Sequence, residues 1–110
     1  MCMKRGNVYL ICDVEKNLYK IGVTTGSIEN RMKKLQTGNG AELLLVNHYE
    51  CDYPFKIEKM LHNHFSNRKV LSEWFNLADE EALSFNQVCE DKDNIIRSLM
   101  DNPFFVKTLH

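Results

Sequence analysis

The two apolar segments nearest the N-terminus constrain the fold of this chain more than any other feature. Residues 8–12 are short, apolar and partly β-branched, and residues 18–24 have a similar character, so both are predicted to be strands. Only the polar residues 14–17 lie between them, which is too short for the crossover that parallel strands require. The two strands are therefore predicted to form an antiparallel hairpin.

The length of this hairpin loop decides which side chains share a face of the sheet. With a four-residue loop at 14–17, Tyr9 lies opposite Gly22 and Ile11 lies opposite Lys20. Tyr9 and Lys20 would then be diagonal neighbours on one face, about 7–8 Å apart. A three-residue loop would place them on opposite faces. Because Gly22 has no side chain, we expect it to leave room beside the phenol for water or a phosphate.

Two helices and one further strand are predicted downstream of the hairpin. Ser27 is the expected N-cap of the first helix, and Gly38 is expected to end it in the left-handed conformation. Residues 42–49 are apolar enough for a central strand, and Pro54 suits the first turn of the second helix. The two helices have apolar stripes at helical spacing, formed by Ile28, Met32 and Leu35 and by Ile57, Leu61 and Phe65.

The C-terminal third is predicted to be helical. A polar break at residues 67–69 and a short extended or turn segment at residues 73–76 come before it. Asp79 is the expected cap of a third helix, and Pro103 is expected to end a fourth. The buried sides of these helices are predicted to carry Ala82, Phe85 and Cys89 and then Ile95, Ile96 and Leu99. The whole pattern predicts an α/β (α+β) fold, a small, mostly antiparallel three-stranded sheet flanked by helices in the order β-β-α-β-α.

Length and charge indicate one functional domain with an appended segment. A chain of 110 residues suits a single domain. Residues 1–75 carry a net charge of +3 and residues 76–110 a net charge of −4, so the first part permits a phosphate-binding face without establishing one. We predict a domain at residues 1–77 and an acidic helical extension at residues 78–110, packed on or next to it. Residues 104–106 (Phe-Phe-Val) could fold back or form a dimer contact, which leaves a homodimer open.

Cysteine spacing and apolar run length argue against a zinc site and a membrane anchor. No two of the four cysteines form a C-x-x-C pair, so reduced thiols are expected. The longest apolar run, residues 43–46, is far too short to span a bilayer, and no signal peptide is recognisable. We therefore expect a cytoplasmic protein with no membrane partner. The four cysteines are Cys2, Cys12, Cys51 and Cys89.

Several motifs, taken in order, resemble the signatures of the GIY-YIG nucleases. Residues 6–9 (Gly-Asn-Val-Tyr) and 19–22 (Tyr-Lys-Ile-Gly) are similar to the paired GIY and YIG motifs. Arg31 on the first helix, Glu58 on the next long helix and the Glu-Trp-Phe run at residues 73–75 follow in the expected order and spacing. The chain is most similar to a short branch, common in viruses and phages, that reads K-I-G in place of Y-I-G and ends in E-W-F. For a viral chain, the expected location is the interior of the host cell.

The resemblance covers residues 6–77 and includes three departures from the better-known pattern. Asn7 stands where the family has the glycine of GIY, and Lys20 stands where it has the tyrosine of YIG. Some members also place a histidine one turn after the helix arginine, at the position that Leu35 occupies here. Lys20 and the missing histidine keep open the alternative that the chain is catalytically inactive.

The chemical requirements of phosphodiester hydrolysis suggest a role for each residue that matches the family motifs. The reaction needs a Lewis acid at the phosphate, a cation for the developing charge, and a group that aims or deprotonates water. Glu58 would hold one Mg²⁺ or Mn²⁺, Arg31 would clamp the phosphate, and Tyr9 would orient the water or act as base. Lys20 would favour the ionised phenol. His62, four residues after Glu58, would assist proton transfer, contact the phosphate, or form an ordinary pair with Glu58.

The resemblance implies a metal-dependent endonuclease acting on nucleic acid, with DNA the first expectation and RNA left open. Products with 5′-phosphate and 3′-hydroxyl ends would follow by family analogy. The alternatives are an inactive module that binds nucleic acid or protein, and a component of a larger machine. Trp74 and Phe75 are expected to close the core rather than stack on bases. Four basic residues are candidate contacts to backbone phosphates, with solvated surface charge as the other interpretation: Lys33, Lys34, Arg68 and Lys69.

Overall fold

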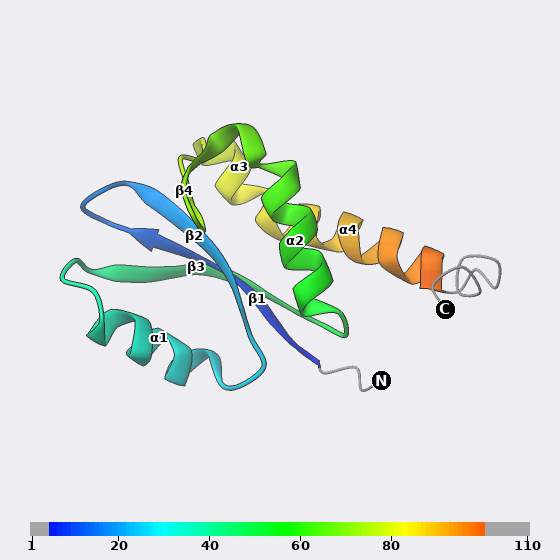
Figure 1. The fold of residues 1–110 in the computed structure, drawn as a ribbon, viewed down its shortest axis with the longest axis horizontal. Coiled ribbons are helices and arrows are strands. Elements are labelled where there is room, and N and C mark those ends of the chain that lie inside the picture. Colours follow the sequence, from blue (N-terminus) through cyan, green and yellow to red (C-terminus); the bar gives the residue numbers. More distant parts are fainter. Residues whose placement is uncertain (1–4, 101–110) are drawn as a thin grey trace.

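The computed structural model describes residues 5–100 and contains one antiparallel sheet with helices on both faces (Figure 1). This confirms the predicted combination of antiparallel sheet and helices. The sheet has five strands in the order β3-β1-β2-β5-β4, so the prediction of three strands was wrong. The strands are β1 (Gly6–Asp13), β2 (Leu18–Thr24), β3 (Leu43–Cys51), β4 (Lys69–Leu71) and β5 (Trp74–Phe75).

The hairpin of β1 and β2 has the predicted register, with Tyr9 opposite Gly22. The buried residue Asp13 closes the turn of this hairpin. The carboxylate of Asp13 accepts hydrogen bonds from two backbone N–H groups of the loop, each at 3.1 Å, and its carbonyl accepts one from Asn17 at 2.8 Å. Asn17 has a φ of 55°, a conformation that asparagine tolerates better than most residues. Local turn chemistry therefore sets the four-residue loop on which the shared face of Tyr9 and Lys20 depends.

Strand β3 lies at one edge of the sheet, so the prediction that it is central was wrong. A continuous apolar run is typical of a strand covered on both sides, but Leu44, Leu45 and Val46 are exposed here. The two missed strands, β4 and β5, have only three and two residues, which is too short to show an alternating pattern. A turn at Ser72, where φ is 53°, joins them, so the segment predicted as a polar break and a turn completes the sheet.

Helices α1 (Ile28–Thr37) and α2 (Pro54–His64) begin as predicted. The Ser27 hydroxyl accepts a hydrogen bond from the N–H of Asn30 at 3.2 Å and caps α1. Gly38 has φ −87° and ψ 5°, so the predicted left-handed end of α1 was wrong. Its N–H instead donates to the Lys34 carbonyl.

The C-terminal helices are divided differently from the prediction. Asp79 begins α3 but does not cap it, because Ala78 holds the cap position and its N–H donates to the Glu81 carboxylate at 2.8 Å. The Ser84 hydroxyl donates to the Glu81 carbonyl. Such a local hydrogen bond competes with continuation of the helix, and it lies where α3 ends. Phe85 therefore opens a second, longer helix instead of belonging to the first. The elements are η1 (Ser66–Arg68), α3 (Asp79–Leu83) and α4 (Phe85–Met100).

The two faces of the sheet carry separate hydrophobic clusters. The larger cluster lies between the sheet and helices α2, α3 and α4, and the smaller one lies under α1, which covers the opposite face (Figure 1). Tyr9 and Ile11 belong to the smaller cluster, while Val8 and Leu10 belong to the larger one. The hairpin therefore places functional candidates from α1 and α2 on opposite sides of the same strands.

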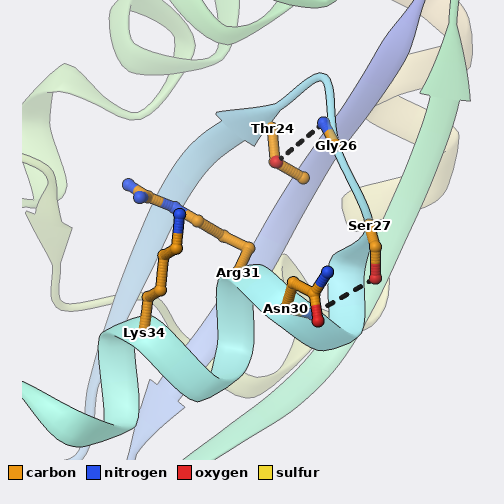
Figure 2. A pocket seen from close by; sticks show the side chains of 6 residues that line it. All are labelled: Thr24, Gly26, Ser27, Asn30, Arg31 and Lys34. Carbon is orange, nitrogen blue, oxygen red and sulfur yellow. Dashed lines mark hydrogen bonds between the residues drawn. The ribbon is translucent and has the colours of Figure 1, made fainter.

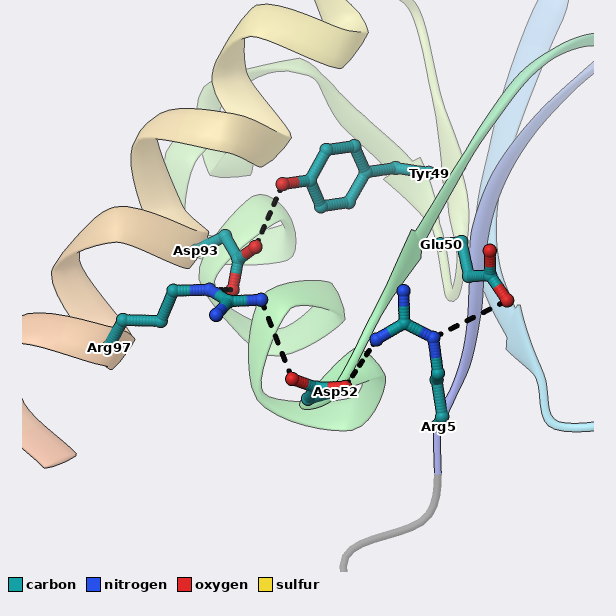
Figure 3. A network of polar contacts seen from close by, with 6 residues as sticks. All are labelled: Arg5, Tyr49, Glu50, Asp52, Asp93 and Arg97. Atoms are coloured by element: carbon teal, nitrogen blue, oxygen red, sulfur yellow. Dashed lines mark hydrogen bonds and ion pairs between the residues drawn. The ribbon is translucent and has the colours of Figure 1, made fainter.

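A chain of polar contacts anchors α4 to the sheet (Figure 3). The Tyr49 hydroxyl donates to the buried Asp93 carboxylate at 2.8 Å, and Arg97 Nε lies 3.2 Å from the other oxygen of Asp93, as an ion pair without hydrogen-bond alignment. Arg97 also pairs with Asp52 at 3.5 Å, and Arg5 pairs with Asp52 as well. Burial, followed by the bond to Asp93, raises the pKa of Tyr49 well above its usual value. Because a buried carboxylate needs partners, these contacts keep α4 in one position.

The cysteines of the described segment are free thiols. Burial raises the pKa of Cys51 to about 11 and that of Cys89 to about 12, so both remain protonated, while Cys12 is half-buried. The predictions for Cys2 and for residues 103–106 lie outside the described residues. Within the described part of the chain, every helix is too short or too polar to cross a membrane.

Candidate functional site

Strand β2 has an open edge next to the candidate residues. Strand β5 pairs only with Tyr19 and Lys20, and the Ile21 N–H donates to the Glu73 carbonyl at 3.2 Å where the pairing stops. Residues 22–24 extend past the end of β5, without a β5 partner among the described pairings. Side chains from both faces of the sheet contact this part of β2.

On the α1 face, Tyr9 packs directly across Gly22. Its side chain is buried, with 1% exposed, and its hydroxyl accepts a hydrogen bond from Arg31 Nε at 3.3 Å. A Cβ on Gly22 would lie 2.6 Å from Cζ and 2.9 Å from Cε1 of the phenol, and closer still to its oxygen. Gly22 therefore makes room for the phenol ring itself, whereas we had expected it to leave room beside the ring.

Gly22→Ala should lower the free energy of unfolding by about 1–3 kcal/mol, the usual cost of overpacking a filled site. The phenol would have to move away from residue 22. Urea unfolding measures the change. Gly26→Ala is the matched control, because the nearest atom to a Cβ there is Thr24 Oγ1 at 3.8 Å. Equal urea midpoints for Gly22→Ala and the wild type would contradict the close approach of Tyr9.

Lys20 forms an ion pair with Glu73, the residue that precedes β5. Its Nζ lies 2.8 Å from Glu73 Oε2 and 5.6 Å from the centre of the Trp74 ring. Only 12% of the Lys20 side chain is exposed, so solvent screens this pair less than an ordinary surface pair. The hydrogen-bond partner of Tyr9 is Arg31, and that of Lys20 is Glu73. Support of an ionised Tyr9 by Lys20 stays a prediction.

On the α2 side, Glu58 and His62 lie one turn apart and both are half-buried. His62 Nε2 is 3.0 Å from the Ile21 carbonyl oxygen, and its ring packs edge-on against Phe75. Burial is the main cause that raises the pKa of Glu58; the nearby Glu73 also raises it, whereas His62 lowers it. The ligand atoms of Glu58, His62 and Glu73 all lie within 4.8 Å of one another, an arrangement that could hold a metal ion.

The peptide between Ile21 and Gly22 connects these two groups of side chains. Tyr9 packs on Gly22 from the α1 face, while His62 contacts the Ile21 carbonyl from the α2 side. Sequence reasoning missed Glu73 as a site residue. Its only signal was its place at the start of the Glu-Trp-Phe run, and nothing local shows that this run pairs with β2.

A pocket of about 280 Å³ lies beside the Tyr9–Arg31 pair, where the β2–α1 loop meets α1. Figure 2 shows the side chains of Arg31 and Lys34 extending from α1 toward β2. The two cations and the surrounding polar groups make this pocket suitable for an anion such as a phosphate. The residues that line it are Thr24, Gly26, Ser27, Asn30, Arg31 and Lys34.

The four basic residues predicted to contact phosphates lie on different parts of the molecule. Lys34 lines the pocket, and Lys33 is exposed on α1 without lining it. Arg68 in η1 pairs with Glu81 at 3.1 Å, and Lys69 is exposed on β4, the other edge strand. Lys34 is therefore the one of these four that joins Arg31 at the pocket.

Comparison with protein families shows a match to the T5orf172 domain over residues 6–90. The match covers 85 of the 110 residues, includes every candidate residue described above, and continues past residue 77 into the C-terminal helices. It describes a phage-type domain related to GIY-YIG-like nucleases. No curated protein and no solved structure matches the chain.

Proposed function

The chain belongs to the T5orf172 domain family, and from this membership we propose that it is a metal-dependent endonuclease that hydrolyses phosphodiester bonds in nucleic acid, with DNA the substrate to test first. The K-I-G and E-W-F motifs support placing it near the short branch of the GIY-YIG nucleases. The observation that carries the proposal is the meeting of two groups at the Ile21–Gly22 peptide. One is the Tyr9–Arg31 pair, and the other is the cluster of Glu58, His62 and Glu73.

Each of these side chains has a separate role in the proposed hydrolysis. Arg31 uses Nε on the Tyr9 hydroxyl, which leaves its two terminal nitrogens to hold a phosphate together with Lys34. The Tyr9 hydroxyl, fixed by Arg31, orients the attacking water, and only its ionised form, the phenolate, takes the proton of that water. Glu58 would hold one Mg²⁺ or Mn²⁺, which fits its half-buried carboxylate and the imidazole and carboxylate beside it, and which supplies Lewis acidity when bound.

The second candidate function is a nucleic-acid-binding module without catalysis. Two observations favour it: Tyr9 is 1% exposed, so water reaches its hydroxyl only if the site opens, and the charge of Lys20 is directed to Glu73. Such a module would use the Arg31–Lys34 pocket to bind phosphates and would leave the strand intact.

Incubation with supercoiled plasmid distinguishes the two functions. We expect nicked plasmid with Mg²⁺ or Mn²⁺ and none with excess EDTA, because Glu58 acts only through the cation that it holds. Single-stranded RNA and branched DNA, tested in parallel, identify the preferred substrate. Cleavage in the presence of excess EDTA would contradict the proposal, and gel retardation of DNA without cleavage at any metal concentration would establish the binding module instead.

A further inference from the structure

We infer that His62 and Glu73 join Glu58 as ligands of a single divalent-cation site, and that this site prefers Mn²⁺ to Mg²⁺. The inference rests on the proposed function, from which it takes Glu58 as a metal ligand. It adds two ligands and a metal preference that the assignment of Glu58 alone does not contain.

Main-chain structure fixes the three ligands relative to one another. Glu58 and His62 are one helical turn apart on α2, and Glu73 is held by the hydrogen bond between its own carbonyl and the Ile21 N–H. One ring nitrogen of His62 and one carboxylate oxygen of each glutamate lie within 4.8 Å of one another. In an octahedral site with metal–ligand bonds of about 2.1 Å, cis ligands are roughly 3 Å apart and trans ligands roughly 4.2 Å apart. Rotation of the three side chains toward one another would therefore close the site.

The hydrogen bond of His62 places the imidazole in a tautomer that can bind a metal. A carbonyl oxygen can only accept, so the contact of 3.0 Å to the Ile21 oxygen requires the proton to be on Nε2. The neutral ring then presents the lone pair of Nδ1 as its remaining donor. Histidine ligands of metals almost always donate their other N–H to a carbonyl or carboxylate in this way, which fixes the tautomer and the ring orientation.

Lys20 places a positive charge next to the carboxylates of Glu73 and Glu58. Its Nζ contacts Glu73 Oε2 at 2.8 Å, and Glu73 faces the half-buried Glu58. Two neighbouring carboxylates in a partly buried position are both ionised only when a cation lies between or beside them. The ammonium meets part of this need in the absence of a metal, and a divalent cation would compete with it for Glu73.

The mixed donor set accounts for the metal preference. Carboxylates suit Mg²⁺ and Mn²⁺ alike, whereas an imidazole favours transition metals over Mg²⁺. Mg²⁺ also loses its water reluctantly and is usually bound through one or two carboxylates only. A site with two carboxylates and one imidazole should therefore bind Mn²⁺ more tightly than Mg²⁺.

Calorimetric titration of the metal-free full chain with Mn²⁺ and Mg²⁺, in the absence of nucleic acid, tests the inference. Glu73→Gln and His62→Gln should each weaken Mn²⁺ binding at least about tenfold. Lys20→Met should tighten it, because the competing ammonium is gone. Glu90→Gln on the exposed face of α4 is the matched control and should bind like the wild type. Circular dichroism of each variant verifies that it is folded.

Pulsed electron paramagnetic resonance of bound Mn²⁺ gives a second readout. Modulation from an imidazole ¹⁴N should be present in the wild type and absent in His62→Gln. Wild-type Mn²⁺ affinity in Glu73→Gln, absent ¹⁴N modulation in the wild type, equal affinity for Mg²⁺ and Mn²⁺, or weaker Mn²⁺ binding in Lys20→Met would each overturn the inference. Cleavage that needs Glu58 but neither His62 nor Glu73 would overturn it while the proposed function stands.

Discussion

Glu58→Gln should abolish cleavage, lowering its rate by at least about 10³-fold, while DNA binding is kept or tightened. A metal-assisted step depends on several kcal/mol of charge stabilisation, and each 1.36 kcal/mol corresponds to a factor of ten in rate. The amide has the shape of the carboxylate but lacks the charge that holds the cation. Removal of one negative charge near the bound phosphate also reduces repulsion of the DNA. Plasmid nicking and gel retardation measure the two effects on the same protein preparation.

The stability of Glu58→Gln separates lost chemistry from lost folding. Because burial raises the pKa of the Glu58 carboxyl, its charged form is disfavoured in the folded state, and a neutral amide is easier to accommodate. The variant should therefore unfold at a urea concentration no lower than that of the wild type in EDTA. Glu90→Gln, exposed on α4, should cleave like the wild type. Undiminished cleavage by Glu58→Gln would remove the metal site from the proposed mechanism.

The parts of this fold that local chemistry dictates could be predicted from the sequence. The antiparallel pairing followed from the short loop, and the register followed from a loop of four residues, whose turn contacts come from Asp13 and Asn17. The Ser27 cap and the start of α2 at Pro54 also depend only on neighbouring residues. These local rules were sufficient to place Tyr9 opposite Gly22.

The parts that depend on distant pairings could not be predicted. Strand β5 has two residues, and its partner strand lies about fifty positions earlier, so no local pattern reveals the pair. Glu73 reaches Lys20, 53 residues away, only through that pairing. The edge position of β3 has the same origin, because an apolar run does not show which strands will flank it. The predicted site therefore contained Lys20 and Glu58 without the carboxylate that lies near both.

Truncation after Leu77 should leave a chain that does not fold, although every candidate catalytic residue comes before that position. Helices α3 and α4 contribute Ala82, Phe85, Cys89 and Ile96 to the larger cluster, next to core residues of β1 and α2. Fully burying an apolar side chain such as Phe or Ile contributes roughly 1.5–3 kcal/mol, so their combined loss, about 5 kcal/mol or more, is comparable to the whole stability of a typical domain. Circular dichroism and light scattering should show an unfolded or aggregated chain, and a soluble, folded monomer would contradict this role of the C-terminal helices.

A pair of point variants tests the same role without removing any of the chain. Phe85 is completely buried at the start of α4, whereas Leu83, two residues earlier, is 85% exposed at the end of α3. Phe85→Ala should lower the free energy of unfolding by about 3–5 kcal/mol, because it removes a large buried ring and leaves a cavity. Leu83→Ala should change it by less than about 0.5 kcal/mol. Urea unfolding of both variants measures the contrast. Similar midpoints would mean that α4 does not pack on the sheet in solution, and would contradict the role of the C-terminal helices in the core.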